Sequence, residues 1–198
     1  VFTMVGQGLR YVKGEQLLWS ALLVAVIFNI TGFSFHTTLV PIFAKDVLYR
    51  DSVGLGILIS SFGIGGLVGS MVWASIPNLR HIGLLCILAV MGWHSTMILF
   101  AASTNFYFSV GILVVTGMLF SSSLVLVLTV LMKTGRPEFR GRLMGLRTLA
   151  IYAHAFGSLA AGAAAGALGA PAAAVLSGAF GIVMMIVLAL IAPKLRRF

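Results

Sequence analysis

The fold is decided by residues 81–132, which read HIGLLCILAVMGWHSTMILFAASTNFYFSVGILVVTGMLFSSSLVLVLTVLM. These 52 residues contain no Asp, Glu, Lys or Arg. As a single helix they would extend about 78 Å, whereas the hydrocarbon core of a bilayer is about 30 Å thick. The segment must therefore fold back once. The polar tripeptide Ser103-Thr104-Asn105 is the best turn, so we predict membrane spans near residues 82–101 and 106–132.

The rest of the chain holds three further uncharged segments of at least span length. Residues 148–193 are 46 long, more than one span needs, so they must also turn once. We place this turn at residues 169–171, because Gly169 can end a helix and Pro171 can open the next one. Residues 16–44 and 52–79 are 29 and 28 long, enough for one span each. We therefore predict six spans, near residues 17–43, 53–79, 82–101, 106–132, 148–168 and 172–192.

Composition favours a membrane protein over a soluble one. The chain has 198 residues, of which 60% are hydrophobic and 9% are charged, whereas soluble domains carry about a quarter charged residues. A disordered chain would be polar and rich in charge. No segment of about ten residues alternates apolar and polar positions as barrel strands do. Because backbone groups in lipid must pair with one another, we predict an all-α membrane protein with six transmembrane helices.

Basic residues separate between the two ends of the predicted spans. Six spans place both termini on one side, and that side holds all 13 Lys and Arg residues except Lys45 and Arg50. The positive-inside rule therefore places both termini in the cytoplasm, with the protein in the plasma membrane (the cytoplasmic or inner membrane of a bacterium). We expect a cytoplasmic linker over residues 1–15, the helix bundle over 16–193 and a basic tail over 194–198. The basic residues form no patch with aromatics, so we expect no nucleic-acid partner.

Two predicted spans, the second and the fifth, carry small residues at helical spacing. These residues are Ser61, Gly65, Gly69, Gly157, Ala161, Gly162 and Gly166. Residues four apart lie on one face of a helix, and small residues there let another backbone approach closely. We therefore predict that these two spans make close helix contacts.

The segment after the fourth predicted span resembles a motif of a known transporter family. Residues 137–146 read PEFRGRLMGL, which resembles the P-E-x-R-G-R-x-x-G segment between the tenth and eleventh helices of major facilitator superfamily transporters. Further similarity lies in Gly8–Val12, Leu39–Ala44, Gly157–Gly162 and Gly169–Pro171. Within the superfamily, the chain looks most similar to the branch of the enterobactin exporter and macrolide-efflux-like proteins.

One signature of the superfamily departs from its usual form in this chain. The loop motif G-x-x-x-D-R-x-G-R would follow the second span, where Gly69 matches its glycine. Trp73 and Ala74 stand where the acidic and the basic residue would be. The matching motifs therefore indicate membership of the superfamily, but they do not indicate which substrate is transported.

The resemblance implies a six-helix, C-terminal half of a twelve-helix major facilitator fold. The partner would be a missing N-terminal six-helix half, and a start at Val1 rather than Met fits a fragment. The small-residue faces of the second and fifth spans would pack against that half. The first and fourth spans would line a central cavity, and His94 in the third would be peripheral. The other implied partners are the lipid bilayer, a small-molecule substrate and protons.

Polar side chains inside the first and fourth spans are candidates for the substrate pathway: Asn29, His36, Thr37, Thr116, Ser121, Ser122 and Ser123. Polar groups inside a bilayer are costly and often mark a pathway. The alternatives are helix–helix hydrogen bonds and, for the hydroxyls, bonds back to a carbonyl one turn earlier. No predicted span contains a charged residue. A proton-carrying carboxylate would therefore lie in the other half, or the imidazole of His36 would act instead.

The loop between the fourth and fifth spans concentrates charge in Arg136, Glu138, Arg140 and Arg142. These residues are candidates for a cytoplasmic gate, in which arginines bond helix C-termini and acidic groups of the other half. The alternative is a role in topology together with attraction to anionic lipid. The sequence leaves both interpretations open.

No residue pattern indicates catalysis or cofactor binding. The chain has no Ser/His/Asp set, metal-ligand spacing or phosphate loop, and Cys86 has no disulfide partner within it. We therefore expect no enzyme activity, no cofactor and no metal. We expect transmembrane transport by alternating access, as secondary-active efflux of a small amphipathic or apolar compound such as a drug or a siderophore. The alternatives are a non-transporting structural or scaffolding subunit and lipid translocation.

Overall fold

Helices make up the architecture of the chain. The computed structural model describes residues 2–76 and 79–198, with the backbone alone for residues 2–5 and 7. Within this part, six helices are long and apolar enough to cross a membrane, and no strand occurs. The predicted all-α membrane fold is therefore confirmed. The six spanning segments are Gln16–Asp46, α4 (Ser52–Ala74), α5 (Ile82–Ala101), α6 (Phe106–Thr134), Pro137–Leu168 and α9 (Ala170–Ile191).

The first and fifth spans are each built from several helical pieces. The first span consists of α2 (Gln16–Ile27), the π-helical turns η1 (Phe28–Phe33) and η2 (Phe35–Leu39), and α3 (Val40–Asp46). The fifth consists of the 3₁₀ turn η3 (Pro137–Phe139), α7 (Arg140–Tyr152) and α8 (His154–Leu168). A π-helix is wider than an α-helix and occurs mostly in single turns. The middle of the first span therefore departs from regular helix geometry over two successive segments.

Helix ends are set by residues that suit them chemically. The Asp51 side chain accepts a hydrogen bond from the backbone N–H of Gly54 at 3.0 Å, and that of Asn105 accepts from Phe108 at 3.1 Å. These caps open α4 and α6. Between α8 and α9, Gly169 has a φ of +84°, a conformation that favours glycine, and a proline stands in the first turn of α9. The chain thus reverses direction at both of the turns that the sequence indicates.

Two helix boundaries differ from those expected from hydropathy. The fifth span includes α7 from Arg140, although the uncharged run begins only at Thr148. Long basic side chains can reach polar surroundings while their backbone continues the helix, so the charge pattern shortens the apparent span. The helix α4 ends at Ala74. Its expected end at Leu79 takes in residues 77–78, which lie outside the described residues.

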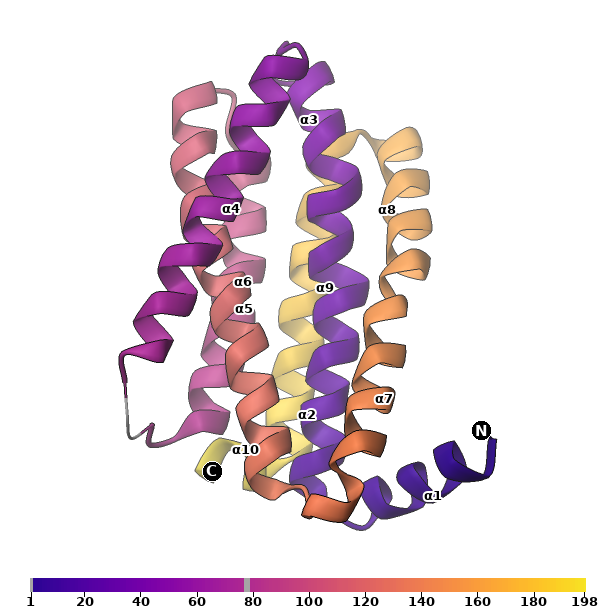
Figure 1. Cartoon of the computed structure of the whole chain (residues 1–198). Helices are drawn as coiled ribbons and strands as arrows, with labels where there is room; N and C mark the ends of the chain where they lie inside the picture. Colours follow the sequence, from indigo (N-terminus) through magenta and orange to yellow (C-terminus); the bar gives the residue numbers. More distant parts are fainter. Residues whose placement is uncertain (1, 77–78) are drawn as a thin grey trace.

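The first span is the most central of the six. In Figure 1 it runs through the middle of the bundle, with α4 and α6 on one side, α7 and α8 on the other, and α9 behind it. Of its most apolar stretch, 56% is buried against other helices, compared with 22% for the fifth span. The short helices α1 (Phe2–Lys13) and α10 (Pro193–Arg197) lie at the same end of the bundle (Figure 1).

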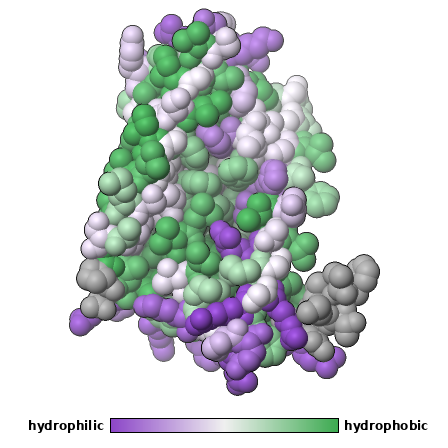
Figure 2. Space-filling model, viewed as in Figure 1, coloured by the Kyte–Doolittle hydropathy of each residue, from purple (hydrophilic) through white to green (hydrophobic). Residues whose placement is uncertain are grey.

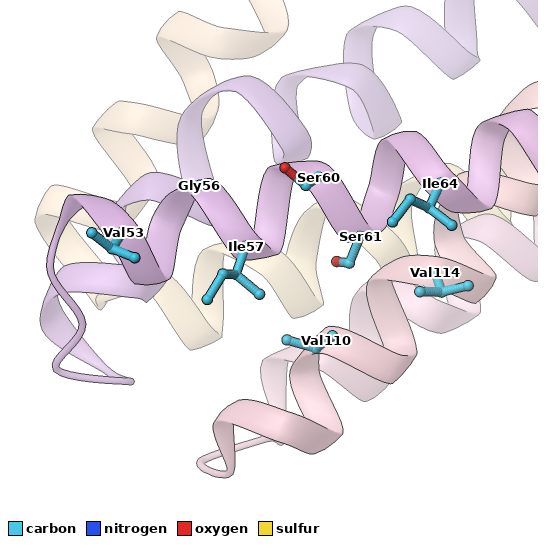
Figure 3. Close-up of a pocket in the computed structure, with 8 residues that line it drawn as sticks. All are labelled: Val53, Gly56, Ile57, Ser60, Ser61, Ile64, Val110 and Val114. Atoms are coloured by element: carbon cyan, nitrogen blue, oxygen red, sulfur yellow. The ribbon is translucent and has the colours of Figure 1, made fainter.

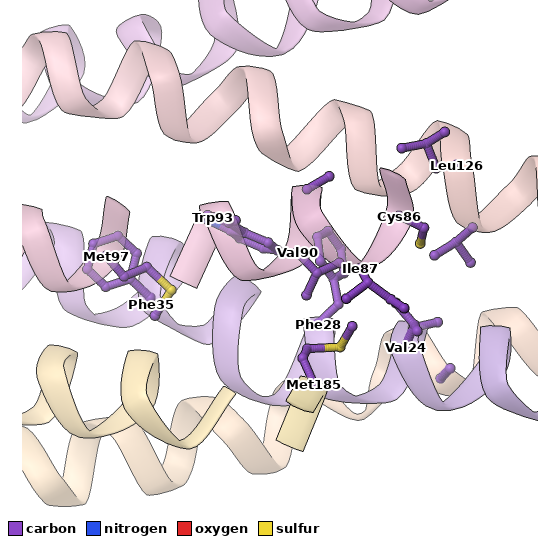
Figure 4. Packing of buried hydrophobic residues seen from close by; sticks show 14 of the residues in the cluster. Val24, Phe28, Phe35, Cys86, Ile87, Val90, Trp93, Met97, Leu126 and Met185 are labelled. Atoms are coloured by element: carbon purple, nitrogen blue, oxygen red, sulfur yellow. The ribbon is translucent and has the colours of Figure 1, made fainter. Parts of the chain in front are cut away.

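Large side chains fill the space between the first span, α5 and α9. Trp93 of α5 is fully buried, and its ring centroid lies 4.2 Å from that of Phe28. A Cβ atom at Gly32 would lie 2.7 Å from the Trp93 ring, so the glycine makes room for the indole. Figure 4 shows Phe28, Trp93 and Met185 among the side chains that meet there. This packing fixes the π-helical segment against α5.

The outer surface is apolar around the middle of the bundle. On α9, for example, Phe180, Val183 and Leu190 are all more than half exposed. Figure 2 shows apolar residues over much of the height of the bundle, while polar residues gather at its two ends, most densely at the end that carries α1 and α10. A soluble protein rarely exposes so large an apolar surface. The helices are therefore embedded in, and in contact with, the lipid bilayer.

Candidate functional site

The π-helical middle of the first span is held by side-chain hydrogen bonds. Four polar residues each donate to the carbonyl four positions earlier: Asn29 to Ala25 at 2.7 Å, Thr31 to Ile27 at 2.6 Å, Ser34 to Ile30 at 2.6 Å and Thr37 to Phe33 at 3.1 Å. In a π-turn the backbone N–H bonds the carbonyl five positions earlier, which leaves room for these side-chain donors. Because such turns occur frequently at functional sites, this segment is the first component of the candidate site.

A buried hydrogen bond joins this segment to α5. The Nδ1 atom of His94 lies 2.7 Å from the carbonyl oxygen of Val90, and Nε2 lies 2.6 Å from the hydroxyl of Thr31. A carbonyl only accepts, so Nδ1 carries a hydrogen, and in the neutral ring Nε2 accepts from Thr31. That hydroxyl has one hydrogen, for which His94 and the carbonyl of Ile27 compete. The bond therefore couples the π-helical geometry to the position of α5.

His94 is buried inside the bundle. Its side chain is completely buried, and a Cβ atom at Gly181 of α9 would overlap its ring. The expectation that His94 lies outside a central cavity stays a prediction. A lone histidine in an apolar run carries no signal of its partner, since Thr31 lies 63 residues away in sequence.

Five aromatic rings from four spans meet beside the π-helical segment. This aromatic cluster consists of Phe33, His36, Phe62, Phe120 and His154. His36 stacks on Phe62 with 3.9 Å between ring centroids, and Phe33 contacts His154 edge-on at 5.5 Å and Phe120 at 5.9 Å. The Nδ1 atom of His36 is buried and has no hydrogen-bond partner among the described residues. The cluster therefore combines apolar ring surface with one buried polar atom whose hydrogen-bonding capacity is unused among the described residues.

Thr37 extends the cluster to the surface of the bundle. Its side chain is exposed, and its hydroxyl lies 3.3 Å from that of Ser158 on α8. Thr37 follows Phe33 by four residues, and Ser158 follows His154 by four, so each pair shares a helix face. This repeated aromatic-then-hydroxyl spacing was the available sequence signal for Phe33, His154 and Ser158. At mid-height of the bundle, Figure 2 shows a few polar residues among apolar ones on the face turned to the viewer.

Comparison with protein-family models identifies the kind of protein that carries this site. A model described as transmembrane secretion effector, of the major facilitator type, matches residues 1–198. The chain belongs to the transmembrane secretion effector family. It is therefore a membrane transporter of the major facilitator superfamily, with a small-molecule substrate. The comparisons with curated proteins and with solved structures gave no match.

Five of the seven pathway candidates are buried within the bundle. Asn29 bonds its own helix, and Thr116 lies 2.9 Å from Thr96 of α5 and 2.7 Å from the carbonyl of Ile112. Each of the three hydroxyls Ser121, Ser122 and Ser123 donates to a carbonyl three or four residues earlier in α6. Of the alternatives open from sequence, helix packing and back-bonding describe these five best. His36 and Thr37 remain as pathway candidates.

The small residues of α4 pack against α6 of the same chain. A Cβ atom at Gly65 would overlap the carbonyl of Val114, and one at Gly69 would lie 2.6 Å from the carbonyl of Met118. Ser61 is buried beside them, and its hydroxyl donates to Leu58 at 2.7 Å. This face was expected to contact a second half, whereas the structure places it inside the bundle. Periodicity predicts a smooth face, but it does not specify the neighbour.

The small residues of α8 divide between two faces. A Cβ atom at Gly157 would overlap the carbonyl of Ile30 in the first span, and Ala161 is buried. Gly162 has only the methyl group of Thr38 nearby, at 3.7 Å, and Gly166 has open space around it. Gly157 and Ala161 therefore pack within the chain. Gly162 and Gly166 lie on a strip that another helix can approach.

An apolar groove of about 530 Å³ lies between the outer parts of α4 and α6. Figure 3 shows Val53, Ile57 and Ile64 of α4 facing Val110 and Val114 of α6 across it. Among its lining residues only two serines are polar. The groove therefore suits an acyl chain or an apolar helix surface better than a polar solute.

The arginine-rich loop contacts α6 and α1. Arg140 donates to the carbonyl of Met132 near the C-terminal end of α6 at 3.4 Å. The backbone N–H of Arg136 donates to the hydroxyl of Tyr11 at 3.1 Å. Arg142 lies over the ring of Phe139 at 5.0 Å. Glu138 is exposed in η3.

Among the described residues, no group of three or more His, Cys, Asp and Glu side chains is placed to hold a metal.

Proposed function

We propose that the chain is one six-helix half of a secondary-active exporter that works by alternating access. The observation that carries this proposal is the aromatic cluster, which four different spans bring together beside the π-helical turns of the first span. Transporters of this kind bind substrate near the middle of the bilayer and rock two halves about it. The cluster, together with exposed Thr37, provides such a mid-membrane site on the half that we have described.

The chemistry of the cluster favours a flat amphipathic substrate. Phenylalanine rings offer stacking surface, and the Nδ1 atom of His36 can bond one polar group of the ligand. The uncharged runs at residues 16–44, 52–79, 81–132 and 148–193 supply no fixed charge to bind an ion, and the cluster offers too few hydrogen-bonding groups for a sugar. A drug-like compound or a siderophore that leaves the cell fits these features. Coupling to protons would then need a carboxylate in the second half, or the imidazole of His36.

The missing half would pack against the exposed side of α8. Gly162 and Gly166 lie on an open strip of that helix, and Phe156 and Leu159 are about three quarters exposed. Small residues allow close approach and large ones add contact area, which is the usual composition of a membrane helix contact. We place both termini in the cytoplasm, since the basic end of the bundle carries α1 and α10.

A dye-efflux assay with the complete transporter in proteoliposomes tests this function. Phe33→Leu keeps an apolar side chain but removes the ring that contacts Phe120 and His154. Loss of aromatic contacts with the substrate should slow efflux of planar amphipathic dyes by up to about tenfold. The matched control is Phe180→Leu on the lipid-facing side of α9, which should transport normally. Unchanged efflux by a well-folded Phe33→Leu variant, or an equal loss in the control, would overturn the proposed site.

A further inference from the structure

A second pocket lies at the end of the bundle that carries α1 and α10, far from the aromatic cluster along the helices. It has a volume of about 500 Å³ and is lined by Arg10, Tyr11, Phe139 and Arg142. Two of these residues come from α1, one from η3 and one from the first turn of α7. The pocket therefore sits where the amino-terminal helix meets the loop between the fourth and fifth spans.

The floor of this pocket is a fixed aromatic stack. The rings of Tyr11 and Phe139 lie 4.2 Å apart, centroid to centroid, with 19° between their planes. The Tyr11 hydroxyl accepts a hydrogen bond from the backbone N–H of Arg136 at 3.1 Å. A Cβ atom at Gly8 would lie 3.5 Å from Cβ of Arg142, so α1 and α7 pack closely. These contacts hold the backbone segments that carry Arg10 and Arg142 next to each other.

Among the described residues, no hydrogen bond or ion pair engages the guanidinium groups of Arg10 and Arg142. Arg142 stacks over Phe139 with its Cζ atom 5.0 Å from the ring centroid, a geometry that leaves the N–H groups at its edge available. Arg10 is exposed. Residues 133–147 contain five basic residues and a single carboxylate, Glu138. Residues 2–13 contain two basic residues and no carboxylate. The local charge is therefore strongly positive and lacks enough acidic groups to neutralise it.

We propose that this pocket binds a phosphate group. The planar fork of an arginine matches phosphate oxygens with two parallel hydrogen bonds, and a pair of arginines forms a strong site for one phosphate. The position at the end of the membrane spans favours the phosphodiester of an anionic phospholipid, since a tyrosine at the end of a span suits the headgroup region and the neighbouring apolar Leu9 is 46% exposed. The bound headgroup would fasten α1 to the start of α7.

The test measures binding of fluorescent phosphatidylglycerol to the complete purified protein in detergent. Arg142→Ala should weaken binding about tenfold, because a charge-assisted bidentate contact is lost. Arg142→Lys, which keeps the charge but loses the planar fork, should weaken it by a smaller factor. The matched control is Arg196→Ala in α10, which removes the same charge from the same end of the bundle outside the pocket and should leave affinity unchanged. Circular dichroism and size-exclusion chromatography verify that each variant is folded.

Two further results decide the proposal and the source of the phosphate. Inorganic phosphate at millimolar concentration should fail to compete if the occupant is a lipid, whereas competition would support the phosphate site and assign it to a soluble ligand. Equal losses in Arg142→Ala and Arg196→Ala would overturn the site, since diffuse attraction to basic residues would explain binding. Unchanged affinity of Arg142→Ala would overturn it as well. Both outcomes leave the transport function of the aromatic cluster untested, so the two proposals fail separately.

Discussion

The α4–α6 contact and the contact of the first span with α5 hold helices together by different means. Between α4 and α6, backbone lies against backbone: a Cβ atom at Gly65 would overlap the carbonyl of Val114, and one at Gly117 would overlap that of Phe62. Between the first span and α5, the large rings of Phe28 and Trp93 interlock, and the hydroxyl of Thr31 bonds His94. The first contact depends on the absence of side chains, and the second on their shape and polarity.

This difference indicates how each contact responds to motion and to substitution. A glycine contact fixes the distance between two helices but contains no directional bond that sets their register. A buried hydrogen bond in lipid does set register, because breaking it leaves polar atoms without a partner. We therefore expect α4 and α6 to move as a close pair, and the first span to change position only together with α5 or after loss of the Thr31–His94 bond.

The largest effect is expected from added bulk in the glycine contact. Gly65→Leu places a side chain where the backbone of Val114 now lies, so α4 and α6 must separate. We expect a loss of about 3 kcal/mol in the free energy of unfolding, as for severe overpacking of a core. Unfolding in mixed micelles with increasing denaturing detergent measures this change. Gly63→Leu is the matched control, since Gly63 is exposed with no atom near its Cβ position. Similar losses in the two variants would contradict the comparison.

A smaller effect is expected from the polar contact. Thr31→Val removes the hydroxyl that bonds His94 and keeps the shape of the side chain. Because hydrogen bonds between membrane helices contribute modestly, we expect a loss of about 0.6 to 1 kcal/mol. The same unfolding measurement applies. Thr129→Val serves as the control, since the hydroxyl of Thr129 bonds the carbonyl of Val125 in its own helix and no other helix within the described part of the chain. A loss in the control that equals that of Thr31→Val would show that the cross-helix bond adds nothing.

The sequence predicts the spans well because hydropathy and capping are local properties. Asn105 opens α6 and Gly169 closes α8, and both were visible as turn residues in uncharged runs. Which helices pack against one another depends on residues far apart in sequence, and this explains why the predicted helix contacts differ from those in the structure. The small residues Ser61, Gly65 and Gly69, spaced four apart, predict a smooth helix face. Nothing in this spacing specifies that the neighbour is α6 rather than a second half of the transporter. Similarly, Gly32 of the π-helical segment packs against Trp93, a contact that only the folded bundle brings together.

The most direct test of the central claim is the access of water to Thr37 in the complete transporter. Thr37→Cys and Val183→Cys, each made after Cys86→Ala, place single thiols at two positions that are exposed in this chain. A thiolate forms and reacts in water but not in lipid. In proteoliposomes, a charged thiol reagent should label position 37 readily and position 183 hardly at all, and a transported dye should slow labelling at 37. Equal labelling of both positions, or none at 37 in a protein that still transports, would contradict a water-filled pathway along the first span.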